Sequence, residues 1–146
     1  MSDTNETYIE TANKLLRGEI SAIETYETAL GKVGDEPELA GTVQNMKDEH
    51  TKAAELLRGR VRALGGEPET GSGAWGAFAT TVAGAASPLG ATAALKALKE
   101  GEEHGLKDYE AQLENFDPET RQHVEQTLIP KSKQHIAKLD ALMAQA

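Results

Sequence analysis

One short pattern occurs twice in this 146-residue chain, and it constrains the fold more than any other feature. The first copy is Gly18-Glu19 followed by Tyr26-Glu27, and the second is Gly101-Glu102 followed by Tyr109-Glu110. An aliphatic residue inside each copy and a leucine after it match as well, always at an offset of 83 residues. Such a repeat predicts two equivalent helices in a pseudo-symmetric bundle. Each helix would carry a glutamate on its apolar face, where a carboxylate needs a partner.

The composition predicts one globular domain spanning residues 1–146. The 24 acidic and 15 basic residues give a net charge of −9, which argues against nucleic-acid and anionic-membrane partners. The absence of cysteine excludes disulfides and thiolate metal sites. The first residues lack a basic region followed by an apolar run, so we predict no signal peptide and a cytoplasmic location.

Four amphipathic patterns predict an all-α fold, because apolar residues recur at alternating steps of three and four. Gly65-Gly66 ends the second pattern, and Asp117-Pro118 starts the fourth with a helix cap and a first-turn proline. Pro130 lies inside the fourth pattern and predicts a kink between Leu128 and Lys131. The predicted helices span residues 4–33, 36–64, 88–115 and 118–144.

The lengths of the connections predict the topology. Short loops join the first two helices and the last two, while residues 65–87 form a long connection between them. This arrangement is typical of two antiparallel hairpins joined by a crossover. Within the crossover, residues 74–83 are compatible with a short helix anchored by Trp75 and Phe78. That helix suits either a lid over one end of the bundle or the surface of a homo-oligomer.

Each predicted helix places one ionisable residue on its inner face near its middle. If the first and third helices pair diagonally, these four residues lie at a similar level of the bundle. Two carboxylates and two imidazoles are donors that suit iron, manganese or zinc. Without a metal, buried carboxylates are costly unless they are protonated or paired. The predicted ligands are Glu19, His50, Glu102 and His135.

Other residues near these positions leave alternatives open. A small rotation of a helix would make Glu24 or Glu103 a ligand, and a rotation that brought Glu49 inward would remove His50 from the inner face. Two tyrosines also lie near the predicted site, where they could either tune a metal or serve as core residues with satisfied hydroxyls. These are Tyr26 and Tyr109. A further alternative is a metal-free layer in which the histidines bond to the glutamates and fix the helix register.

The two hairpins, the crossover and the glutamates of the first and third helices resemble the ferritin-like di-iron proteins. In those proteins the other two helices each supply a Glu-x-x-His motif. The segments Leu64-Gly65-Gly66-Glu67-Pro68-Glu69 and Gly101-Glu102-Glu103, with the histidine of the fourth helix, also resemble an uncharacterised bacterial ferritin-like family. The resemblance covers about residues 8–143. It implies a ferritin-like four-helix bundle that binds iron in stress or metal homeostasis.

Two positions depart from the ferritin-like pattern. Lys47 and Ser132 stand three residues before the histidines, where the motif has glutamates, and Lys47 would direct a positive charge at the site. This departure argues against a complete two-metal centre and favours either a single-metal site or one that has lost its metal. Two functions therefore stay open. One is a metal-binding protein that oxidises ferrous iron or reduces peroxide, and the other is a structural or interaction bundle without a cofactor.

Overall fold

The structure of the chain, a computed structural model, describes residues 2–33, 36–71 and 90–145. It confirms the all-α fold, since every regular element within these ranges is helical. None of the described helices has the length and apolar character needed to cross a membrane. The elements are α1 (Ser2–Val33), α2 (Pro37–Ala63), α4 (Gly90–Ala111), the 3₁₀ turn η2 (Leu113–Asn115), α5 (Pro118–His123), the π-helical turn η3 (Val124–Leu128) and α6 (Ile129–Gln145).

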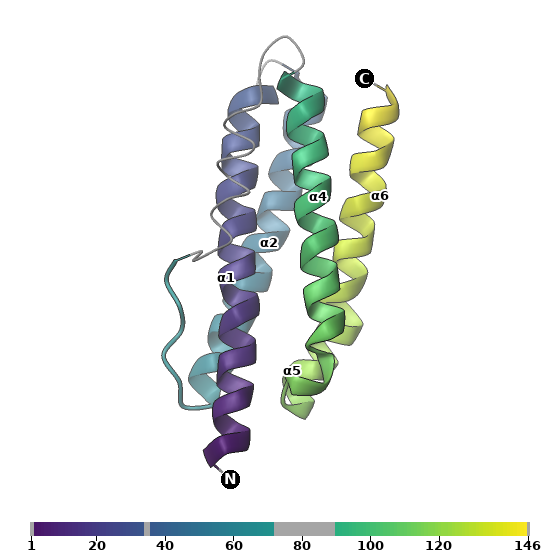
Figure 1. Cartoon of the computed structure of the whole chain (residues 1–146). Helices are drawn as coiled ribbons and strands as arrows, with labels where there is room; N and C mark the ends of the chain where they lie inside the picture. Colours follow the sequence, from purple (N-terminus) through teal and green to yellow (C-terminus); the bar gives the residue numbers. More distant parts are fainter. Residues whose placement is uncertain (1, 34–35, 72–89, 146) are drawn as a thin grey trace.

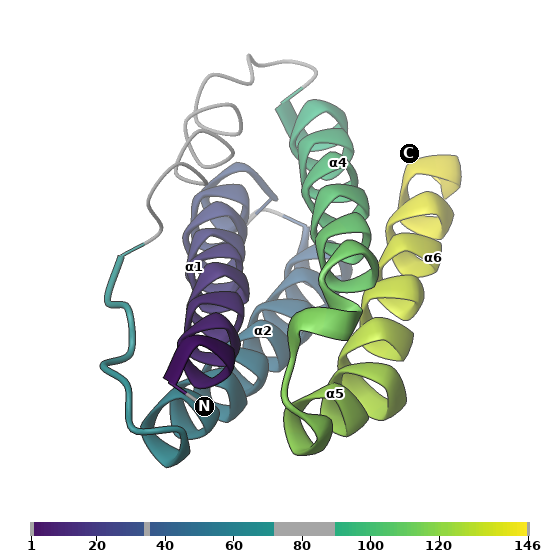
Figure 2. The same ribbon diagram turned by 60° about the horizontal axis from the view of Figure 1, so that its bottom comes forward.

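The helices form two antiparallel hairpins, as the connection lengths predicted. One hairpin is α1 with α2, and the other is α4 with the segment formed by α5, η3 and α6 (Figures 1 and 2). α1 packs against both α2 and α4, and it runs antiparallel to α4 (Figure 1). The two helices that carry the sequence repeat are therefore neighbours, and the expectation that they pair diagonally is wrong.

The hydrophobic core consists of two clusters separated by buried polar side chains. The first cluster includes Tyr26, Met46 and Leu98, and the second includes Leu57 and Phe116. Each cluster receives residues from both hairpins, so apolar burial holds the hairpins together on both sides of the polar layer. The polar layer between the clusters contains all four residues predicted from the inner faces of the helices: Glu19, His50, Glu102 and His135.

α2 ends at Gly65-Gly66, as predicted. Gly65 has a φ of +88°, and the N–H groups of Gly65 and Gly66 bond to the carbonyls of Arg62 and Val61 at 3.0 and 2.9 Å. These two bonds form a Schellman motif, which satisfies carbonyls at the helix C-terminus. Gly66 also packs closely on α1, since a Cβ there would lie 2.6 Å from a methyl carbon of Ile9.

The start of the crossover lies along α1. Asn13 donates to the carbonyl of Glu67 at 3.0 Å and accepts from the N–H of Glu69 at 2.9 Å. Arg17 of the same helix pairs with the carboxylate of Glu69 at 2.8 Å. The short helix expected at residues 74–83 falls outside the described residues.

The irregularity expected in the fourth helix lies upstream of its predicted position. The N–H of Ile129 bonds to the carbonyl of Val124, which is the i→i−5 pattern of a π turn. Pro130 follows directly, and it has no N–H to donate. The spacing from Glu102 to His135 is longer than that from Glu19 to His50. A π turn accommodates one extra residue, so it accounts for part of this difference.

In the second hairpin, the connection between α4 and α5 is stabilised by Asp117, which caps α5. Its Oδ2 atom accepts from the Thr120 N–H at 3.3 Å and from Arg60 of α2 at 3.1 Å. Arg60 also pairs with Glu119 at 2.7 Å, but the Glu119 side chain is 65% exposed whereas that of Asp117 is 9% exposed. The same arginine therefore has one buried and one exposed carboxylate partner.

We expect Asp117→Ala to lower the free energy of unfolding by about 1–3 kcal/mol, because the cap and the buried partner of Arg60 are both lost. Glu119→Ala removes only an exposed ion pair and should cost less than about 0.5 kcal/mol. Urea denaturation of the two variants measures the difference. Equal losses would contradict the role of Asp117 as a cap.

Candidate metal centre

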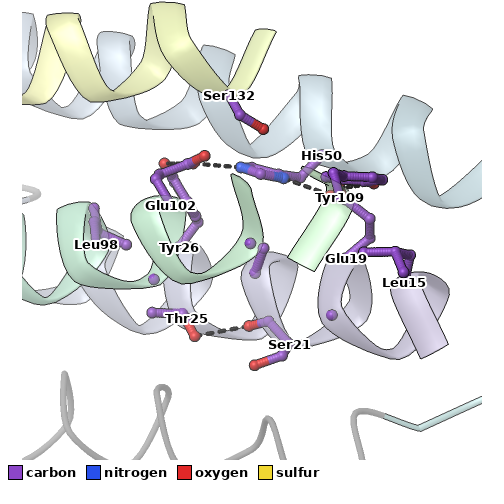
Figure 3. A pocket seen from close by; sticks show the side chains of 14 residues that line it. Leu15, Glu19, Ser21, Thr25, Tyr26, His50, Leu98, Glu102, Tyr109 and Ser132 are labelled. Carbon is purple, nitrogen blue, oxygen red and sulfur yellow. Dashed lines mark hydrogen bonds and ion pairs between the residues drawn. The ribbon is translucent and has the colours of Figure 1, made fainter. Parts of the chain in front are cut away.

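The four predicted residues meet in one buried layer, where His50 lies between the two glutamates. His50 Nδ1 is 2.6 Å from Glu19 Oε1, and its Nε2 is 2.5 Å from Glu102 Oε2 (Figure 3). The ring centroid of His135 is 4.9 Å from that of His50, and its Nδ1 atom is 3.2 Å from the same Glu102 oxygen. All four residues are 7% exposed or less.

The two repeat tyrosines bond to the glutamates of each other's helix. The Tyr109 hydroxyl of α4 donates to Glu19 of α1 at 2.5 Å, and the Tyr26 hydroxyl of α1 donates to Glu102 of α4. Each tyrosine follows the glutamate of its own helix by two helical turns, so antiparallel packing brings it to the other glutamate. Burial and the nearby carboxylates raise the pKa of both tyrosines, so both hydroxyls stay protonated and able to donate.

Glu49 reaches the layer together with His50. Its Oε1 atom contacts His135 Nε2 at 2.8 Å, and its Oε2 atom contacts Lys131 Nζ at 2.5 Å. Burial by itself would raise the pKa of Glu49, but the hydrogen bonds from Lys131 and His135 outweigh it and lower the pKa to about 2. An ionised carboxylate only accepts, so the Nε2–H group of His135 donates to Glu49. The expectation that Glu49 could face inward only by displacing His50 is wrong.

Three other expectations are wrong, two of them about glutamates and one about a lysine. Glu24 and Glu103, the other alternative ligands, are exposed to solvent and lie away from the layer. The Lys47 ammonium lies 3.6 Å from the carboxylate of Glu27 on α1, so it is not directed at the histidines.

Lys131 supplies the cation that borders the layer instead, and sequence reasoning missed it. It precedes His135 by four residues, which places both on one face of α6. Once His135 is assigned to the inner face of the helix, this spacing predicts that Lys131 lies near the polar layer. Ser132, which stands where the ferritin-like motif has a glutamate, is 6% exposed and lies beside the layer (Figure 3).

His50 is doubly protonated in this arrangement, because both of its ring nitrogens face carboxylate oxygens that can only accept. Burial by itself would lower the pKa of His50, but the charges of Glu102 and Glu19 outweigh it and raise the pKa well above 6.5. For Glu102, burial opposes ionisation, but the charge of His50 and contacts with both histidines lower the pKa to about 2.

A buried group of two histidines and one glutamate could hold a metal. One donor atom each from His50, Glu102 and His135 lies within 4.8 Å of the others. His135 Nδ1 has no hydrogen-bond partner among the described residues, although Glu102 is 3.2 Å away. A buried polar atom without a partner requires an explanation, and a cation between this nitrogen and the carboxylate would satisfy both. Imidazole and carboxylate donors suit iron, manganese and zinc.

Comparisons with known proteins give a family and no closer relative. No curated protein and no solved structure matches the chain. One family model matches residues 7–115, a range that includes Glu19, His50 and Glu102 and ends before Lys131 and His135. That range is well over half of the 146 residues. The chain therefore belongs to the family described as a domain of unknown function (DUF2383).

Proposed function

We propose that this protein binds one divalent metal ion in the buried layer, with His50, Glu102 and His135 as ligands. The observation that carries the proposal is the buried Nδ1 atom of His135, which has no hydrogen bond within the described part of the chain and lies 3.2 Å from the carboxylate of Glu102. The three donor atoms lie close enough together for one ion to replace their mutual contacts.

Glu19 and Glu49 are assigned to orienting the two histidines. Glu19 accepts from Nδ1 of His50, and Glu49 accepts from Nε2 of His135. The other nitrogen of each ring is thereby turned toward Glu102. Carboxylates that accept from the second ring nitrogen fix the tautomer and orientation of metal-binding histidines. The proposal thus gives Glu19 an orienting role, where the sequence predicted a ligand.

Iron is the metal we propose first, because two histidines and one carboxylate form the ligand set of non-haem iron(II) sites. Bound iron would supply one-electron chemistry at a buried position, suited to oxidation of ferrous iron or reduction of peroxide. The hairpin topology and the crossover support assigning the bundle to the ferritin-like class. Lys131 favours a single ion, because its ammonium group already occupies the free oxygen of Glu49.

Metal content per chain tests this proposal directly. The metal-free protein is incubated separately with Fe²⁺ without oxygen, Mn²⁺ and Zn²⁺, then desalted and analysed. We expect about one iron per chain, and more than about a tenfold loss in affinity for Glu102→Ala and His135→Ala. Glu103→Ala and His123→Ala are matched controls, because both residues are exposed. A wild-type protein that retains no metal would overturn the proposal.

A change at the orienting carboxylates should have a different effect from a change at a ligand. We expect Glu19→Gln and Glu49→Gln to weaken metal affinity by about 10- to 100-fold while one ion per chain still binds at saturation. Competition against a coloured chelator measures this affinity. If Glu19→Gln abolished binding as completely as Glu102→Ala, Glu19 would be a ligand, as the sequence predicted.

The alternative function is a structural bundle in which the layer acts without metal. The observation that favours it is His50, which bonds to both glutamates and satisfies them in the absence of any ion. Such a layer would fix the helix register. Under this alternative, the thermal midpoint is the same with chelator and with added metal, whereas a bound ion would raise it.

A further inference from the structure

A small cavity lies between α1 and α4, directly against the polar layer (Figure 3). Its volume is about 40 Å³. His50 and Glu102, two of the three proposed ligands, form part of its lining, and so does Ser132. The cavity therefore adjoins the position proposed for the metal rather than a remote part of the core.

The glycines of the sequence repeat help to form this cavity. Gly18 and Gly101, each directly before a repeat glutamate, both line it. Residues without side chains leave space beside the carboxylates of Glu19 and Glu102. Ser132 contributes as well, because a serine occupies less volume than the glutamate of the ferritin-like motif. The Gly-Glu unit thus supplies both a carboxylate and adjacent space.

A second cavity, of about 150 Å³, lies between α2 and α6, but its setting differs. Glu49 and Lys131, which form an ion pair, are part of its wall. Its lining includes one proposed ligand, His50, but not Glu102, whereas both of these residues line the cavity between α1 and α4.

We infer that the cavity between α1 and α4 holds the exogenous ligand of the metal site and limits it to about two or three heavy atoms. This inference rests on the proposed function. A water-sized molecule needs about 10–15 Å³ of such space, so the cavity has room for about three. A site with two histidines and one carboxylate keeps coordination positions open for such a ligand. The substrate class is then a small inorganic molecule such as dioxygen or a peroxide.

Gly105 offers a way to fill the cavity without disturbing the layer. It lines the cavity, and a Cβ added there meets no atom within 4 Å. A leucine can therefore enter without displacing the backbone, and it favours the helix more than glycine does. Gly59 of α2 provides a matched control, because it is exposed and an added Cβ there also meets nothing within 4 Å.

The experiment uses cobalt(II) as the metal and azide as the probe. Cobalt content per chain is measured first for the wild type, Gly105→Leu and Gly59→Leu. Azide is then titrated while the visible absorption of cobalt is recorded, and imidazole serves as a larger probe. We expect azide to change the spectra of the wild type and Gly59→Leu. Gly105→Leu should need at least about tenfold more azide, and imidazole should leave all three spectra unchanged.

The outcomes separate this inference from the proposed function. Equal azide affinity of Gly105→Leu and Gly59→Leu, with equal cobalt content, would overturn the role of the cavity and leave the metal site intact. Imidazole binding as tightly as azide would overturn the size limit. A wild-type protein that takes up no cobalt or iron would overturn the proposed function, and this inference with it.

Discussion

Glu102→Ala should lower the free energy of unfolding of the metal-free protein by about 3–5 kcal/mol. Glu102 contacts His50, His135 and Tyr26, and it is 5% exposed. Its removal leaves the charged His50 with a single carboxylate partner and the Tyr26 hydroxyl without its acceptor. Breaking a buried ion pair by removing one partner is among the largest causes of destabilisation by a single substitution. Urea denaturation with a chelator present measures the loss.

Two further variants make the result specific to the polar layer. Glu103→Ala changes the neighbouring exposed glutamate and should cost less than about 0.5 kcal/mol. Replacing Glu19, His50 and Glu102 together by apolar residues of similar size should recover most of the lost stability, because no buried charge is left unpaired. If Glu102→Ala costs no more than Glu103→Ala, the layer does not hold the charges that its contacts imply.

The helices and their connections could be predicted from the sequence, because apolar periodicity, caps and glycines act locally. Gly65 ends α2 through its own backbone conformation, and Asp117 caps α5 through the adjacent turn. The relative orientation of α1 and α4 could not be predicted. A repeat with an offset of 83 is the same whether the helices are neighbours or diagonal, so the exchanged contacts of Tyr26 and Tyr109 emerged only from the packing.

The four central residues of the site could be found from helix periodicity, but the outer contacts could not. Glu49 is turned about 100° from His50 on an ideal helix, so periodicity allowed only one of them inside. The Glu49 side chain nevertheless extends to α6, where it contacts Lys131 and His135. The direction of a long charged side chain depends on which partner lies nearest, and Lys47 illustrates the same point by pairing with Glu27.

The second large effect concerns pH. In the metal-free protein the pKa of His50 is raised above 6.5, so its stabilising contribution is complete below pH 6.5 and is lost as pH rises through the folded-state pKa. The pKa of Glu102 is lowered from 4.5 to about 2, so its contribution is present above pH 4.5 and is lost as pH falls toward 2. When only the contributions of His50 and Glu102 are considered, the metal-free protein is most stable between about pH 4.5 and 6.5.

Metal binding should cancel this loss of stability above pH 6.5, because a metal at His50 Nε2 must displace the proton that now bonds to Glu102. With one proton released, metal affinity rises by up to about tenfold per pH unit until the folded-state pKa of His50 is passed. At saturating metal, the stabilisation by the ion then grows by about 1.4 kcal/mol per pH unit.

Thermal unfolding between pH 5.5 and 8, with and without Mn²⁺, measures the stabilisation by the ion, and calorimetry in two buffers of different ionisation enthalpy counts the protons that are released. Glu102→Ala should show no such rise. A stabilisation by Mn²⁺ that stayed constant across this range would mean that the ion binds without displacing the His50 proton, which would remove His50 from the ligand set.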